Sequence, residues 1–229
     1  MKEMRSHIKT AIILSLLMLM GIGTAKSQDD IRPRLGIRVG LDIDCPTKYN
    51  FKNGTSVSLF GAGAGFSVTG VYNLPISYSN FYFEPGVTLY YNTLSMDVDK
   101  LDGNTSVPEP SSMSTRLFGF RLPFVFGYAL PLEKVKVHLF AGPVLQIGLV
   151  ARQHISMKYS DINLGGSTNA YGDDGLLDRF DCGIRIGAGV EQNNWIFQFY
   201  GTIGTCDQAS SKYAKMRTSQ IVIGLGYNF

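Results

Sequence analysis

Three short groups of residues could carry out chemistry or bind a ligand, and His154 with Ser156 is the first of them. A histidine beside a serine can remove the hydroxyl proton and turn the serine into a nucleophile. These two residues lie where a predicted strand runs into a long polar segment, and no carboxylate is placed to orient the histidine. Because the set lacks a third member, we predict that the protein is not an enzyme and has no catalytic residue.

The second group is the glycine-rich segment Gly61-Ala-Gly-Ala-Gly65. Glycine-rich loops cradle phosphate groups when they have a fixed spacing and lead from a strand into a helix. This segment lacks that spacing, and no helical pattern follows it. We therefore predict no nucleotide site and no cofactor.

The third group is the three cysteines, Cys45, Cys182 and Cys206, whose spacing is not that of metal ligands. These cysteines can form a disulfide if the chain is exported, which the N-terminal segment described below predicts. Cys45 and Cys206 are both expected at the outer ends of strands with one strand between them, so they are a candidate disulfide. The sequence leaves a bridge and three unpaired cysteines equally open, because connectivity cannot be deduced from it. No metal site is predicted.

A larger set of charged residues occupies the face of each predicted strand that lies opposite an apolar row. These residues are Arg38, Asp42, Glu84, Arg121, Lys136, Asp181, Arg185 and Glu191. An Arg or Lys facing lipid at mid-depth costs roughly 2–4 kcal/mol, so we expect all eight to face inward. Four are positive and four are negative, which suits pairing in a closed lumen. We expect Arg38, Arg121 and Arg185 to meet Asp42, Glu84 and Asp181, with Glu84 and Arg121 within reach of each other on adjacent strands.

The clearest of the elements that position these side chains is the C-terminal segment 219–229. Its alternate residues form an apolar and aromatic face that ends on Phe229. Chain ends usually fray into water, but a terminal aromatic suits a transmembrane β-barrel, in which aromatic residues form a girdle at each interface. The spacing of Gly224, Tyr227 and Phe229 resembles the C-terminal signal by which outer-membrane barrels are recognised for assembly. We expect the Phe229 ring to lie in the periplasmic girdle with Tyr227 and Trp195.

Eight segments share this alternation of period two, and no helical period follows residue 27. The predicted strands are 34–43, 59–73, 81–93, 115–128, 135–150, 177–191, 195–205 and 219–229. Short connections alternate with long polar ones, notably 94–114 and 151–176, which is typical of outer-membrane barrels with periplasmic turns and extracellular loops. A soluble lipocalin-like barrel would instead expose polar residues to water. The fold class predicted is all-β, an eight-stranded antiparallel up-and-down transmembrane β-barrel.

The N-terminal segment 1–27 has the layout of a cleaved signal peptide. Basic residues precede an apolar run over 11–22, and Ala25 and Ser27 occupy the positions before the cleavage point. The run is short of the roughly 20 residues that a spanning helix needs. We therefore predict a signal peptide over 1–27 and one barrel domain over 28–229. Residues 1–27 hold four of the 21 basic and one of the 18 acidic residues, so the mature chain has no formal net charge. A nucleic-acid partner is not expected.

Five segments resemble those of the PorT-like outer-membrane β-barrel proteins, which are related in shape to the small OmpA- and OmpX-type barrels. The segments are Gly65-Phe-Ser-Val-Thr-Gly-Val-Tyr72, Phe81-Tyr-Phe-Glu-Pro-Gly-Val-Thr-Leu-Tyr90, Leu122-Pro-Phe-Val-Phe-Gly127, Phe140-Ala-Gly-Pro143 and Phe180-Asp-Cys-Gly-Ile-Arg-Ile-Gly-Ala-Gly189. The resemblance covers nearly all of the mature chain. It implies a multi-pass protein of the Gram-negative outer membrane and supplies no catalytic residues.

Two classes of function remain after these exclusions. The first is a non-catalytic barrel that displays extracellular loops, with a structural or interaction role in the envelope. The second is an accessory component of protein secretion, or a narrow transport pore. The partners expected are outer-membrane lipid, the barrel assembly machinery and an unidentified protein at the extracellular loops. A lumen closed by paired charges favours the first class.

Overall fold

The computed structural model describes residues 32–51, 54, 56–57, 60–76, 80–96, 110–132, 134–159, 162–171, 177–210 and 214–229. Two compact units divide the chain, Met1–Arg32 and Pro33–Phe229. The predicted signal peptide over 1–27 lies outside the described residues. Among those residues, no helix is long and apolar enough to cross a membrane.

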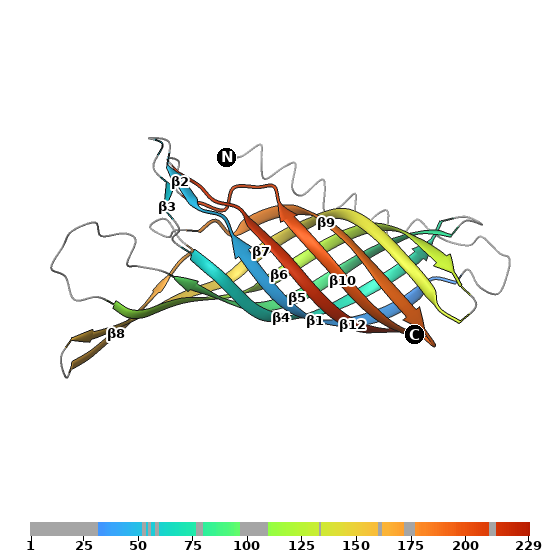
Figure 1. Cartoon of the computed structure of the whole chain (residues 1–229), viewed down its shortest axis with the longest axis horizontal. Coiled ribbons are helices and arrows are strands. Elements are labelled where there is room, and N and C mark those ends of the chain that lie inside the picture. The colour runs from blue at the N-terminus through green and yellow to red at the C-terminus, as the bar shows by residue number, and fades with distance from the viewer. Residues whose placement is uncertain are drawn as a thin grey trace. The chain divides into compact units, whose positions relative to one another are not determined.

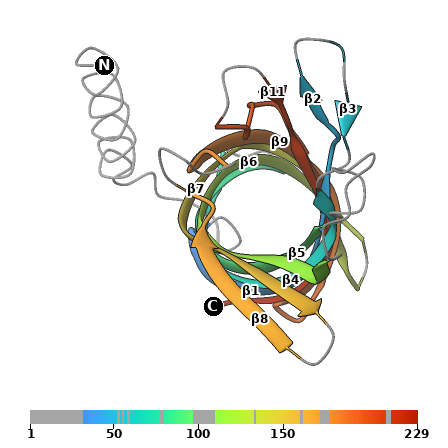
Figure 2. The same ribbon diagram turned by 90° about the vertical axis from the view of Figure 1, so that its left-hand side faces the viewer.

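Eight long strands of the second unit close into a barrel (Figures 1 and 2). They are β1 (Arg34–Pro46), β4 (Phe60–Pro75), β5 (Phe81–Met96), β6 (Pro110–Pro131), β7 (Lys136–Tyr159), β9 (Phe180–Gln192), β10 (Trp195–Gly204) and β12 (Thr218–Asn228). Each pairs in antiparallel register with the next barrel strand along the chain, and β12 pairs with β1 to complete the ring. The predicted fold class is confirmed.

Four further strands lie outside this ring. Three short ones, β2 (Tyr49–Phe51), β3 (Ser56–Val57) and β11 (Ala214–Lys215), form a small separate sheet. The fourth, β8 (Ile162–Asn169), pairs with the far end of β7 and extends the sheet beyond the barrel, as Figure 1 shows. Segment 151–176 was expected to be a loop, but β7 and β8 fill much of it. The alternation of apolar residues stops where the strands leave the apolar belt, so the pattern did not reveal them.

The two faces of the barrel strands differ sharply in exposure. On β1, the outward residues Leu35, Val39 and Leu41 are exposed, whereas Arg38 and Asp42 on the other face are buried. This alternation repeats along β9, β10 and β12. In the end-on view of Figure 2 the ribbons form a closed ring. The side chains of the inward face are buried and fill the space that this ring encloses. The outer surface is therefore apolar, while the interior is polar.

Candidate functional site in the barrel lumen

Arg121 is the centre of an ion-pair network in the middle of the lumen. Its Nη1 lies 2.6 Å from Asp42 Oδ2 on β1, and its Nε donates to Gln146 Oε1 on β7 at 2.8 Å. The guanidinium also stacks on the Tyr90 ring of β5, with 4.0 Å between its central carbon and the ring centroid. Arg121 therefore connects β6 to β1, β5 and β7 across the interior.

Asp44 belongs to the same network, although it is not among the eight charged residues predicted to face the lumen. Its Oδ1 lies 4.0 Å from Arg121 Nη2 and accepts a hydrogen bond of 2.9 Å from Gln220 Nε2. Its other oxygen accepts from the Asn92 amide. Asp44 has the same parity as Asp42, but the predicted strand ended at Ile43, one residue too early. A predicted strand that extended to Pro46, as β1 does, would have placed Asp44 on the inward face.

Arg38 forms a second cluster nearer the inner end of the barrel, where the short connections lie. Its Nη2 donates to Asn228 Oδ1 at 2.6 Å and lies 3.4 Å from Glu84 Oε2. Glu84 was expected within reach of Arg121, but the register places it opposite Val125, and Arg121 opposite Thr88. Glu84 is therefore four residues away from the level of Arg121, and it pairs with Arg38 instead.

Glu191 contacts two basic side chains at the inner rim of the barrel. Its Oε2 lies 2.9 Å from His138 Nε2 and its Oε1 3.3 Å from Arg34 Nη1. Lys136 lies opposite Glu191 in register but forms no ion pair with the described residues. The structure thus brings Glu191 together with His138 and Arg34, neither of which was among the eight residues predicted for the cluster.

Arg185 was expected to meet one of the three carboxylates Asp42, Glu84 and Asp181, but it forms no ion pair with any of them, and Asp181 on the same strand is not its partner. Arg185 and Asp181 are four residues apart on β9, which places them roughly 13 Å apart along an extended strand. Arg185 is buried and stacks on the Tyr200 ring, with 4.1 Å between its central guanidinium carbon and the ring centroid. No described carboxylate lies within ion-pair distance of Arg185. Asp181 instead accepts hydrogen bonds from Gln208 Nε2 at 2.6 Å and from the Cys182 backbone at 2.7 Å.

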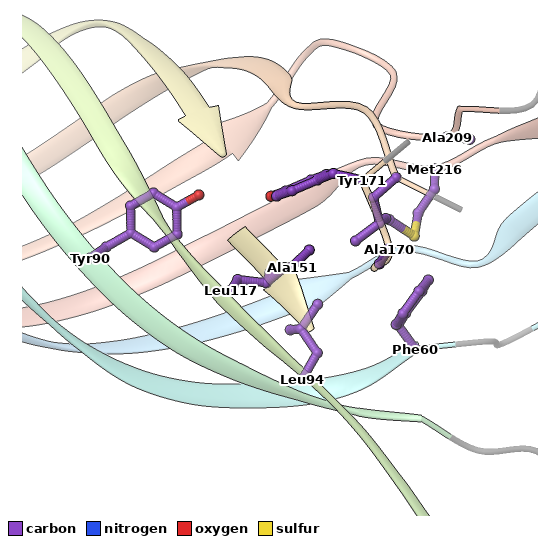
Figure 3. Close-up of a cluster of buried hydrophobic side chains, with 10 residues drawn as sticks. Phe60, Tyr90, Leu94, Leu117, Ala151, Ala170, Tyr171, Ala209 and Met216 are labelled. Carbon is purple, nitrogen blue, oxygen red and sulfur yellow. The ribbon is translucent and has the colours of Figure 1, made fainter. Parts of the chain in front are cut away.

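An apolar cluster lies beyond the charges, toward the outer end of the lumen (Figure 3). It consists of Phe60, Tyr90, Leu94, Leu117, Ala151, Ala170, Tyr171, Leu177, Ala209 and Met216. The first five come from barrel strands, and the last five come from the segments that connect β8 with β9 and β10 with β12. Backbone hydrogen bonds hold these segments in place, including Ala170 N to Ala151 O at 2.8 Å. We call this cluster the outer cap.

Tyr90 and Tyr171 connect the charged network with the outer cap. Their hydroxyl groups point toward each other in Figure 3. The guanidinium of Arg121 lies over the face of the Tyr90 ring. Tyr171 lies outside the barrel strands, and burial raises its pKa above the ordinary value of a phenol. Tyr171 is therefore uncharged over the physiological pH range, which suits its place in an apolar cluster.

Small cavities lie among the described side chains of the lumen. One of about 30 Å³ is lined in part by Asp44, Arg121 and Asp181, and one of about 20 Å³ by Arg38 and Arg185. A buried water needs roughly 10–15 Å³ of cavity volume, so each cavity has room for about one or two waters. In the described part of the chain, no group of three His, Cys, Asp or Glu side chains could hold a metal ion.

The disulfide differs from the candidate that the sequence suggested. Cys206 is bonded to Cys182, with 5.1 Å between their Cα atoms, and Cys45 is free and exposed. Neighbouring strands are about 4.8 Å apart, so two residues separated by an intervening strand are roughly 10 Å apart. A disulfide needs Cα atoms within about 7 Å, which excludes Cys45 and Cys206. The observed bridge joins the end of β10 to its neighbour β9, at the base of the outer cap.

The C-terminal aromatic residues form a contact series at the inner rim. The Trp195 and Tyr227 ring centroids are 5.3 Å apart, as are those of Tyr227 and Phe229. The Phe229 backbone N–H donates to Leu35 O at 2.8 Å, and the ring itself is exposed on the outside. Gly224 faces the lumen. Whether Gly224, Tyr227 and Phe229 act as an assembly signal stays a prediction.

Comparison with known proteins gives one match over most of the chain. The model of a family described as "Outer membrane protein beta-barrel domain" matches residues 23–207. No curated protein matches the chain.

Several solved structures are similar at low identity. The attachment invasion locus protein Ail of Yersinia pestis is 12% identical, with a TM-score of 0.40 over 86% of this chain and 99% of that one. Neisserial surface protein A is 13% identical, with a TM-score of 0.39 over 84% and 97%. The N-terminal β-barrel domain of Pseudomonas aeruginosa OprF is 12% identical, with a TM-score of 0.26 over 83% and 97%. Similarity at this level carries no conclusion about ligands or partners.

Proposed function

Because this chain belongs to the outer membrane protein β-barrel domain family, we propose that it is a non-catalytic membrane barrel that displays its outer segments while its lumen stays closed. It lies in the outer membrane of a Gram-negative bacterium. The observation that carries the proposal is the filling of the lumen at two successive levels. The network around Arg121 occupies the middle, and the outer cap covers the end beyond it.

The long strands support a display role for the outer end. A membrane-spanning strand needs about 9–11 residues, and β6 and β7 have 22 and 24 residues respectively. Together with β8 they form a three-stranded sheet that continues past the barrel. The end of β8 from Gly166 to Asn169 is exposed, so a protein partner can reach it.

The lumen and the outer sheet offer little support for catalysis. His138 pairs with Glu191, and no described hydroxyl or thiol group bonds to it. His154 is exposed on the outward face of β7, with Ser114 and Ser167 as its register partners. The Ser156 side chain lies outside the described residues. A general base needs a nucleophile within hydrogen-bond distance, and neither histidine has one among the described side chains.

We also propose that the chain falls in the PorT-like group, which the five segments quoted above support. A role as an accessory of protein secretion goes with that proposal. A narrow pore is disfavoured, because an ion would have to displace paired side chains in the middle of the lumen and then pass the outer cap.

The closed lumen is tested by conductance in planar bilayers. We expect wild-type protein to insert without raising the conductance above that of a lipid membrane treated with detergent alone. Insertion is verified independently by protease protection of the reconstituted barrel. Stepwise current increments from inserted wild-type protein would refute the closed lumen.

Display at the cell surface is tested by cysteine labelling of intact cells. Cys45 is first replaced by Ser, since it is free and exposed. We expect Gly166→Cys at the end of β8 to react with a membrane-impermeant maleimide on intact cells. The matched control Lys134→Cys lies in a short connection at the opposite end and should react only after permeabilisation. Labelling in the reverse order would show that the barrel inserts the other way round.

A further inference from the structure

Two arginines face each other on the outward surface, where β6 and β7 leave the barrel. Arg116 on β6 and Arg152 on β7 are register partners, and both side chains are exposed. Their sequence neighbours Thr115, Leu117 and Ala151 are buried on the inward face. The alternation of the strands therefore directs both guanidinium groups outward.

This arrangement is unfavourable for the bare protein. Like charges directly opposite each other across an antiparallel pair destabilise it. Among the described residues, no hydrogen bond or ion pair offsets the repulsion between Arg116 and Arg152. Among the residues that the structure describes, the nearest side chains on the outward face carry no negative charge. On the same face, Ser114 and His154 form the next register pair toward the outer end of the strands, and Asn169 on β8 is the other register partner of Arg152.

The height of the pair on the barrel indicates what could neutralise it. The next outward pair toward the middle of the barrel is Phe118 with Val150, and both are exposed and apolar. These two residues end the apolar belt on β6 and β7. Arg116 and Arg152 therefore lie directly above the lipid-facing surface, at the level of lipid headgroups.

We propose that Arg116 and Arg152 bind a phosphate group of an outer-leaflet lipid. Cβ atoms of directly opposed residues are about 4.5–5.5 Å apart, so the two guanidinium groups can hold the oxygens of one phosphate between them. The site binds a lipid rather than free phosphate, because the acyl chains of that lipid lie against Phe118 and Val150 below. The phosphate also removes the repulsion between the two arginines.

The test is lipid binding to the full mature barrel in non-ionic detergent, followed by native mass spectrometry. The probes are bisphosphorylated lipid A and the same lipid with its phosphates removed. We compare wild type, the double variant Arg116→Gln with Arg152→Gln, and Arg217→Gln. Arg217 is an exposed outer-end arginine beside Thr47, far from β6 in strand order, which makes it a matched control.

We expect wild type and Arg217→Gln to bind the phosphorylated lipid at least about tenfold more tightly than the dephosphorylated one, since charge-assisted hydrogen bonds are strong. The double variant should lose that preference. An equal preference in the double variant and in wild type would overturn the proposal. Displacement of the lipid by excess inorganic phosphate alone would overturn the assignment to a lipid.

A thermal measurement on Arg152→Gln gives a second, independent outcome. In detergent without phosphorylated lipid, this variant should melt at a higher temperature than wild type, because one of two opposed charges is gone. Adding bisphosphorylated lipid A should reverse that order by stabilising wild type alone. A lower melting temperature of the variant in lipid-free detergent would contradict the repulsion on which the proposal rests.

Discussion

Replacing Arg121 with Ala is expected to destabilise the folded barrel by roughly 3–5 kcal/mol, the cost of breaking a buried ion pair by removing one partner. The loss would leave the buried carboxylates of Asp42 and Asp44, which lie side by side on β1, without their ion-pair partner. It would also remove the stacking on Tyr90. Water that enters the emptied space will reduce the cost. Denaturant unfolding in detergent, followed by the fluorescence of the single tryptophan Trp195, measures the effect.

Arg34→Ala is the matched control for this substitution. Arg34 also faces a carboxylate, but its side chain is 29% exposed at the rim and its closest carboxylate oxygen is 3.3 Å away. A pair of this kind contributes about 1 kcal/mol or less. In an Asp42→Asn background, Arg121→Ala should cost less than in wild type, because directly paired residues are energetically coupled. Equal unfolding midpoints for Arg121→Ala and Arg34→Ala would contradict the role of Arg121 as the centre of the lumen.

The barrel strands could be predicted because lipid imposes one simple rule on their outward face. A charged residue that faces lipid is costly, so the alternation marks the part of each strand that crosses the apolar belt. Most predicted bounds lie within three residues of those observed, but β6 begins five residues earlier and β7 ends nine residues later. The rule ends at the membrane surface. β7 continues to Tyr159 with Arg152 and His154 on its outward face, and the predicted strand therefore stopped at Val150.

The partners of the lumen charges could not be predicted, because they depend on the stagger between strands. The parity of each residue gives its face but not its height. Arg38, Asp42 and Arg121 are buried in the interior, but only the structure shows that Glu84 pairs with Arg38 rather than with Arg121. The disulfide partner of Cys206 could not be predicted for a similar reason. It depends on which residues of the neighbouring strands β9 and β10 lie opposite each other.

Deleting Phe229 is expected to reduce the amount of assembled barrel in the outer membrane several-fold, with little change in the stability of the barrels that do form. The Phe229 side chain is 72% exposed, and the structure shows one ring contact for it, with Tyr227. Such a side chain contributes little to the folded state. Its proposed value lies in recognition of the chain end by the assembly machinery, before the barrel closes.

Phe81→Ala separates recognition from a general loss of aromatic surface. Phe81 lies at the same end of the barrel and is 54% exposed, and its ring centroid is 4.9 Å from that of Tyr128. The Phe81→Ala variant therefore lacks an aromatic ring that is similar in exposure and position to that of Phe229. It is not at the chain end, so its substitution should leave the assembled amount near that of wild type. Both proteins are also refolded in detergent, where the assembly machinery plays no part. Their free energies of unfolding should then agree with that of wild type within about 1 kcal/mol, as expected for exposed positions. If Phe81→Ala lowers assembly in cells as much as the deletion does, Phe229 acts as one more girdle residue rather than as part of a signal.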